Sequence, residues 1–323
     1  MFKKMVGKIT DNKKASCSLL PAIMGHSPWQ TPNETLRKVR GYIAGEEDRW
    51  IGNEATRWGD RLEDIVLTEG WKRLNIMQGW ADMNISTPAI HPTLPLEASL
   101  DGATNSESPL SLDGQVIEEN LERGIYVCGD TRILLDGNGV LEAKVTRNRP
   151  EDFPALYRGP LQMQGQMMCT GYKWGALMVL YGGVEMRIWL MTPHAKTVKA
   201  IEDAVIDFDR RLHLPEPEWY DLASGADASM VYALGDQEEP IEIENEEMAR
   251  EYLTLKNQVK EAEKTLELMS VKFQSMMGNH QTAHAGKYEI KWPLRNYKAQ
   301  PEKVVPPKDA RQVRSKTITM KRK

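Results

Sequence analysis

Residues 176 to 191, ALMVLYGGVEMRIWLM, contain two runs of β-branched, aromatic and other apolar side chains on either side of a glycine pair, Gly182 and Gly183. Two such runs around a two-glycine turn are typical of a β-hairpin. The next segment, residues 195 to 214, has apolar residues at helical spacing and predicts an amphipathic helix. Strands that alternate with helices indicate an α/β or α+β core.

Further helices are indicated upstream of this hairpin. SLLPAIM predicts a short helix that stops at Gly25, and a second helix follows with Asn33 as its N-cap and Gly45 near its end. Residues 53 to 74 predict a longer helix. Its apolar stripe at three- to four-residue spacing consists of Ala55, Trp58, Leu62 and Ile65.

The middle of the chain predicts strands. Residues 87 to 102 are extended and end in an Asp-Gly turn, and residues 103 to 124 are polar and read as an inserted loop. Residues 124 to 147 predict two strands joined by a turn at DGNG. GPLQMQGQMMCTG predicts a helix with Pro160 in its first turn and Gly171 beyond its end.

Residues 236 to 247 carry seven acids and no base, and we expect this linker to divide a core of residues 1–235 from a C-terminal region of residues 236–323. A long helix follows the linker, with apolar residues in a 4-3-4-3 pattern that predicts packing along another helix, in the same chain or in a neighbour. Residues 287 to 323 hold twelve Lys and Arg against three acids, a basic tail suited to DNA although the net charge is −4. The heptad positions are Met248, Tyr252, Leu255, Val259, Ala262, Leu266, Met269, Phe273 and Met276.

Composition excludes several classes of protein. No apolar run is long enough for a transmembrane helix, and the N-terminus lacks the apolar stretch of a secretory signal. The three cysteines are far apart without C-x-x-C spacing, and the six histidines show no zinc-binding pair. We therefore expect a cytoplasmic protein without a zinc site, an iron–sulfur cluster or a membrane partner.

The stretch GVLEAKVTR places Glu142 and Lys144 two residues apart on one face of a predicted strand, opposite the face of Leu141 and Ala143. One interpretation is a half-exposed strand with a cross-strand ion pair. The other is a metal-dependent nuclease, because clustered carboxylates hold Mg²⁺ and a neighbouring group can orient or deprotonate the attacking water.

The nuclease hypothesis needs an aspartate from an adjacent strand. Asp101 is the preferred candidate because an extended segment leads directly into it, whereas Asp113 follows a polar stretch and Asp136 falls in the expected turn. Glu63, on the helix of residues 53 to 74, lies beside the apolar stripe and is a candidate fourth acid.

The order of these motifs resembles a known family. GDRLE on a helix, SLDG after a strand, LEAK on the next strand and LQMQGQMMCTG on a helix follow the opening motif LLPAIMGHSPWQTP. Together, over roughly residues 15 to 210, they resemble the YqaJ-type viral recombinases, relatives of phage lambda exonuclease in the PD-(D/E)xK superfamily. The resemblance implies a restriction-endonuclease-like core, a central mixed sheet flanked by helices.

The resemblance also implies roles for particular residues. Asp101, Glu142, the carbonyl of Ala143 and Glu63 would hold two Mg²⁺ ions, for which Mn²⁺ can substitute. Lys144 would orient or activate the water, with a lowered pKa if it acts as a base. Gln162 would lie at the catalytic site, and Gln166, Ser18 and Lys14 would contact DNA. The arginine that precedes this serine in the family is absent, and only Lys13 and Lys14 stand there.

The activity implied is degradation of one strand of linear duplex DNA from its 5′ end, which leaves a 3′ overhang for a single-strand annealing recombinase in a phage or prophage. Family members form ring-shaped trimers around DNA. Two alternatives stay open: an endonuclease of the same superfamily, and a DNA-end-binding or recombinase-loading module without activity. A cluster-bearing exonuclease would need four cysteines, and the chain has three.

Overall fold

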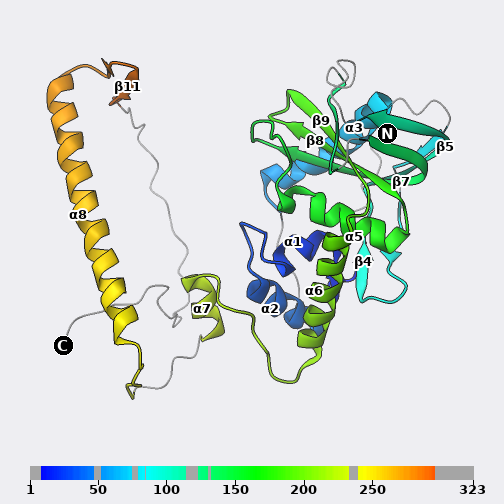
Figure 1. Cartoon of the computed structure of the whole chain (residues 1–323), viewed down its shortest axis with the longest axis horizontal. Helices are drawn as coiled ribbons and strands as arrows, with labels where there is room; N and C mark the ends of the chain where they lie inside the picture. Colours follow the sequence, from blue (N-terminus) through cyan, green and yellow to red (C-terminus); the bar gives the residue numbers. More distant parts are fainter. Residues whose placement is uncertain are drawn as a thin grey trace, which may run out of the picture. The chain divides into compact units, whose positions relative to one another are not determined.

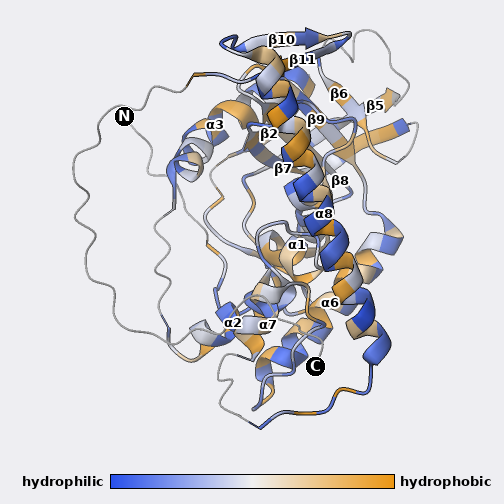
Figure 2. Cartoon of the chain, turned by 90° about the vertical axis from the view of Figure 1, so that its left-hand side faces the viewer, coloured by the Kyte–Doolittle hydropathy of each residue, from blue (hydrophilic) through white to orange (hydrophobic). Residues whose placement is uncertain are grey.

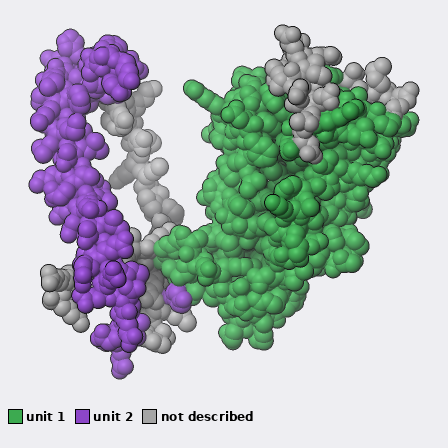
Figure 3. Space-filling model, in the orientation of Figure 1, with its two compact units in different colours: residues 1–231 green, residues 232–323 purple. Residues whose placement is uncertain are grey.

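The structure is a computed structural model of the chain and describes residues 9–46, 52–74, 79–83, 85–113, 123–129, 132–232 and 239–294 (Figure 1). The chain divides into two compact units, residues 1–231 and residues 232–323 (Figure 3). The boundary expected between residues 235 and 236 lies outside the described residues.

A six-stranded mixed sheet forms the centre of the first unit, in the order β2-β5-β7-β8-β9-β6. Neighbours are antiparallel except for the pairs β7/β8 and β6/β9, which are parallel. The strands are β2 (Gly79–Asp82), β5 (Gly102–Asp113), β6 (Ile125–Val127), β7 (Arg132–Thr146), β8 (Trp174–Tyr181) and β9 (Glu185–Met191). The mixed α/β fold expected from the sequence is confirmed.

Helices cover both faces of this sheet (Figure 1). On one face, α3 (Glu54–Leu74) buries Val66 and Leu67 against Leu141 of β7. On the other, α5 (Pro160–Thr170) packs on Val140 of β7. The remaining elements on the α5 side are η1 (Cys17–Leu19), α1 (Leu20–Ile23), α2 (Pro32–Ile43), η2 (Leu156–Arg158) and α6 (Ala195–His213), with a small sheet β1-β4-β3 of Ala15–Ser16, Leu96–Ala98 and Ala89–Ile90.

Several elements agree with the sequence. The hairpin β8/β9 turns at Gly182 and Gly183, which both have positive φ, and α6 follows it. Helix α5 has proline at its first position and ends at Gly171 in the left-handed conformation. These boundaries were predictable because proline suits the first helical turn and glycine adopts positive φ without strain.

Two predictions for the middle of the chain are wrong. Residues 103 to 113 form a strand and not part of a loop, and DGNG is not a turn. Residues 102–113 form β5, and β7 runs unbroken through DGNG as a 15-residue strand. Gly137 takes a φ of 66° inside β7, and the pairing of β5 with β7 shifts register between Ser106 and Leu110. Pro109 lies within this shift and cannot donate a ladder hydrogen bond, so the irregularity is absorbed there.

Two helix predictions need correction. The N-cap of α2 is Thr31, whose side chain accepts from the backbone N–H of Glu34 in a capping box, and not Asn33. Asn33 is buried and instead bonds Asp227 of α7 (Gly225–Val231) and the backbone of Tyr220. The expected apolar stripe of α3 is also wrong, since Trp58 and Ile65 are exposed and the buried residues are Val66, Leu67, Gly70 and Leu74.

The second unit contains α8 (Glu246–Met277), the long helix that the heptad pattern predicts, and a hairpin of β10 (Thr282–Ala285) and β11 (Tyr288–Lys291). Asn245 caps α8 by accepting from the N–H of Met248. The basic tail beyond residue 294 lies outside the described residues.

Candidate active site

Glu142 and Lys144 lie on β7, a central strand of the sheet, in the part that pairs with β8 but extends beyond the start of β5. Leu141 and Ala143 face α3, so Glu142 and Lys144 face the α5 side, as strand alternation requires. The Glu142 side chain is fully buried, and its Oε1 forms an ion pair with Nζ of Lys144, whose side chain is 31% exposed. The carboxylate of the pair is therefore buried and only its lysine reaches solvent, so this is not a half-exposed surface pair.

Gln166 of α5 holds the second oxygen of Glu142. Its Nε2 donates to Oε2 of Glu142 at 2.5 Å and to the carbonyl oxygen of Ser99 at 3.2 Å. Gln166 is fully buried, and its Oε1 has no hydrogen-bond partner within the described chain. This glutamine therefore ties β7 to the segment that precedes Asp101.

Asp101 follows β4 and comes just before β5, and its Oδ2 accepts the backbone N–H of Ala143 at 2.9 Å. Strand β5 begins at Gly102, opposite Leu141, so it does not extend to Ala143. Because the N–H and C=O of one strand residue point to the same side, the Ala143 carbonyl also faces the side that β5 leaves open. Asp113 lies at the far end of β5, and Asp136 is exposed on β7.

Glu63 belongs to the buried side of α3, three to four residues before Val66 and Leu67. Burial, with the negative charge of Glu142 as the next cause, raises the pKa of Glu63 from 4.5 to about 7, while Lys144 opposes the shift. The same two causes raise the pKa of Asp101 well above its usual range, against Lys144 and the Ala143 N–H. The charges of these three acids, from α3, from the segment before β5 and from β7, thus act on one another.

The pKa of Lys144 is raised, not lowered as expected from the sequence. Burial alone would lower the pKa of the ammonium, but the carboxylates of Glu142 and Asp101 outweigh that effect. In the protein alone, Lys144 is therefore a stable cation that donates hydrogen bonds and offsets part of the negative charge.

The donor chemistry of this cluster suits a hard divalent cation, which prefers carboxylate and carbonyl oxygens. Burial first, and the repulsion between the acids second, raise the pKa values of Glu63 and Asp101, and a bound cation would relieve both effects. As the described side chains stand, no group of three or more His, Cys, Asp or Glu has the arrangement to hold a metal ion. Glu142 is engaged by Lys144 and Gln166, and Asp101 by Ala143.

The structure distinguishes the two glutamines of α5. The side chain of Gln166, which is expected to contact DNA, is fully buried against Glu142 in the chain alone, and its DNA contact stays a prediction. Gln162, one turn earlier, is partly exposed. A spacing of four residues puts both glutamines on the same helix face, and only the contact with Glu142 separates their environments.

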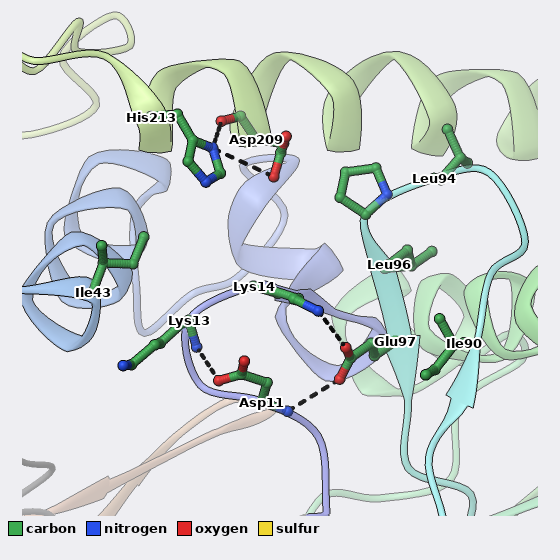
Figure 4. Close-up of a pocket in the computed structure, with 11 residues that line it drawn as sticks. Asp11, Lys13, Lys14, Ile43, Ile90, Leu94, Leu96, Glu97, Asp209 and His213 are labelled. Atoms are coloured by element: carbon green, nitrogen blue, oxygen red, sulfur yellow. Dashed lines mark hydrogen bonds and ion pairs between the residues drawn. The ribbon is translucent and has the colours of Figure 1, made fainter.

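Lys14 and Ser18 lie at the other DNA-facing position expected from the sequence. Ser18 is exposed, with its Oγ 3.1 Å from that of Ser16. Lys14 lines a pocket of about 390 Å³ and forms an ion pair at 3.1 Å with Glu97, a nearly buried residue of β4 (Figure 4). The side chain of Lys13 points away from that pair. The charge of Lys14 is thus already partnered, and its DNA contact stays a prediction.

Ser99 and Glu97 were not singled out in the sequence, although both precede Asp101 by an even number of residues. Ser99 supplies a carbonyl to Gln166 and its hydroxyl oxygen to the N–H of Ile9. Glu97 accepts from Lys14 and from the N–H of Asp11. The alternation L-E-A-S-L-D from Leu96 to Asp101 was the only available signal.

No protein-family model and no curated protein matches the sequence. Among solved structures, the chain is similar to LHK-Exo, an alkaline exonuclease from Laribacter hongkongensis. In the complex of LHK-Exo with dAMP, the identity is 18% and the TM-score 0.41, covering 62% of this chain and 88% of that one.

A phage-related exonuclease from Haemophilus somnus 129PT is similar at 12% identity and a TM-score of 0.39, covering 61% of this chain and 92% of that one. None of the described helices combines the length and apolar character needed to span a membrane.

Proposed function

We propose that the protein is a metal-dependent deoxyribonuclease that degrades one strand of linear duplex DNA. The observation that carries this proposal is the Glu142–Lys144 ion pair on β7 beside Asp101, which accepts the N–H of Ala143 at the point of the sheet where β5 begins. The charge of Glu63 acts on the same groups. Such a cluster of mutually repelling carboxylates, with Glu142 buried and Glu63 and Asp101 half-buried, is destabilising for the fold and is typical of a functional site.

Asp101, Glu142 and the Ala143 carbonyl would hold the metal, with Glu63 completing the acidic set. Mg²⁺ is the proposed ion, in two copies, with Mn²⁺ as a substitute. When bound, the metal would supply charge stabilisation at the attacking and leaving oxygens of the phosphodiester. Lys144 would donate a hydrogen bond to the attacking water or to a phosphate oxygen, the role that suits a lysine whose pKa is raised.

The finer activity rests on the order of motifs along the chain. Digestion from the 5′ end, a 3′ overhang, use by a single-strand annealing recombinase of a phage or prophage, and a ring-shaped homo-oligomer are all taken from that resemblance. Ser18, at an exposed position two residues after β1, is the proposed phosphate contact on the DNA. A cytoplasmic location belongs to the same proposal.

The test uses duplex DNA labelled at one 5′ end, as a linear molecule and as a closed circle of the same sequence, each with Mg²⁺ or with EDTA. Release of labelled mononucleotide from the linear DNA with Mg²⁺ only, and an intact circle, supports the proposal. A cut circle assigns the endonuclease activity instead. If neither DNA is degraded while linear DNA still binds, the protein is a DNA-end-binding module.

A further inference from the structure

The heptad seam of α8, defined as Met248, Tyr252, Leu255, Val259, Ala262, Leu266, Met269, Phe273 and Met276, has no role in the proposed site. All of its residues are exposed except Tyr252, which is half-buried. Apolar and polar residues follow each other along the whole helix (Figure 2). An apolar row of this length on a surface marks a site of association.

The spacing of the seam specifies what can cover it. A repeat of 3.5 residues, kept for the whole length of α8, keeps one row of side chains facing a second helix with the same repeat. Heptad positions a are Tyr252, Val259, Leu266 and Phe273, and positions d are Met248, Leu255, Ala262, Met269 and Met276. A second α8 in parallel and in register offers an apolar partner to every one of these positions.

The residues that flank the seam suit the same arrangement. In a parallel pair, position g of one helix lies near position e of the next heptad of its partner. This rule sets Glu251 beside Lys256 of a second copy, so two opposite-charge pairs form in the dimer. The other flanking combinations are Gln258 with Glu263, Thr265 with Ser270 and Lys272 with Met277, and none sets like charges together.

We propose that the α8 seam is a self-association surface, on which a second copy of this chain binds as a parallel, in-register, two-stranded coiled coil. The occupant is a second copy because identical helices match all nine apolar positions and the charged pair at once. The surface lies wholly in residues 232–323 and does not depend on the nuclease proposal.

Two leucines on α8 provide a matched test. Leu266 is a seam residue and Leu268 is not, yet both are exposed in the single chain, by 67% and 57%. Light scattering after gel filtration of the full chain should show that Leu266→Glu halves the mass relative to wild type, whereas Leu268→Glu leaves it unchanged. Circular dichroism checks that both variants keep their helix. A monomeric wild type, or equal effects of the two substitutions, overturns the proposal.

Charge reversal tests the register. Glu251→Lys replaces both Glu251–Lys256 pairs of the dimer by Lys–Lys pairs. We expect the dissociation constant of the dimer to rise at least tenfold. Combining it with Lys256→Glu should restore the wild-type affinity, because the pair is then reversed. Glu251 and Lys256 are five residues apart in one chain and do not face each other there, so restoration reports the contact between copies. Failure to restore overturns the parallel register.

A cysteine cross-link tests the orientation. In the proposed dimer the two copies of Met269 face each other, so Met269→Cys should give a disulfide-linked dimer on mild oxidation. Val271→Cys, exposed but outside the seam, should not. The wild type, in which Cys17 and Cys169 are buried and Cys128 is partly exposed, gives the background. An antiparallel pair would separate the two copies of Met269 along the helix, and absence of the cross-link would overturn the parallel arrangement.

Discussion

The side-chain nitrogen of Gln166 bridges Oε2 of Glu142 and the carbonyl oxygen of Ser99, at 2.5 Å and 3.2 Å. One amide thereby fixes the separation between the strand that carries Glu142 and the turn that carries Asp101. The bridge is buried, so the amide of Gln166, and not bulk water, satisfies this oxygen of Glu142.

Removing this bridge should damage the chemistry more than DNA binding. Gln166→Ala leaves the second oxygen of Glu142 without its donor, and we expect the rate of hydrolysis to fall about 10- to 100-fold, as for other residues that orient ligands. Gln162→Ala should have a smaller effect on that rate. Single-turnover hydrolysis and DNA affinity of both variants are the measurements. Equal rates of hydrolysis for the two variants would show that Gln166 does not position Glu142 for the reaction.

Replacing Lys144 should separate binding from hydrolysis. Lys144→Ala removes the cation that pairs with Glu142, and we expect hydrolysis to fall by at least about 100-fold, the usual contribution of a proton-transfer or positioning group. DNA binding should persist because one charge among many contacts is lost. Lys199→Ala, on an exposed face of α6, is the control. An active Lys144→Ala enzyme would exclude this lysine from the reaction.

The metal-free protein should become less stable as pH rises from about 4.5 to about 7. Glu63 has its pKa raised to about 7 in the folded chain, so the folded state binds more protons than the unfolded state in this window. The free energy of unfolding therefore falls as pH increases. Urea unfolding at both ends of the window measures the slope, which Glu63→Gln should reduce.

Mg²⁺ should oppose this loss of stability if it binds the same acids. The ion binds the ionised carboxylates, so its stabilising effect should grow with pH across the same window. A Mg²⁺ effect that is independent of pH, or unchanged by Glu63→Gln, would place the ion away from this cluster. This measurement needs no DNA and no turnover.

Two glycines of α3 should respond oppositely to the same substitution. Nothing lies near the position that a Cβ on Gly59 would take, so Gly59→Ala should stabilise the fold by roughly 0.5–1 kcal/mol through helix propensity. A Cβ on Gly70 would overlap the buried side chain of Met178 in β8. Gly70→Ala should therefore destabilise by about 1–2 kcal/mol, the overpacking cost less the propensity gain. Thermal unfolding of both variants would reveal whether α3 packs on β8 in this way.

The sequence predicted best those elements whose signals are local. The β8/β9 hairpin, α5 and α6 depend on turn glycines, a first-turn proline and a continuous apolar period, all contained within the element. β5 has few strand-forming residues, and its long pairing with β7 determines its conformation. No local pattern reports such a partner, so this strand was read as a loop.

Helix α3 shows a second limit of sequence reasoning. It carries two apolar rows at helical spacing, one through Trp58 and Leu62 and one through Val66, Leu67 and Leu74. Periodicity alone cannot choose which row faces the sheet. The buried row includes the position of Glu63, so the same misassignment hid how deeply this acid lies in the cluster. The roles of Gln162 and Gln166 also needed the tertiary contact with Glu142.

The central position of β7 has a consequence for the order in which the protein folds during its synthesis on the ribosome. The strand carrying Glu142 and Lys144 is held on one side by β8, which ends at Tyr181, and its glutamine brace lies on α5. A nascent chain that has not yet emerged past that residue lacks one neighbour of the strand. Contacts so distant in sequence form late. The cluster of Glu63, Asp101, Glu142 and Lys144 therefore cannot assemble on the growing chain before β8 is available, although all four of its side chains were synthesised earlier.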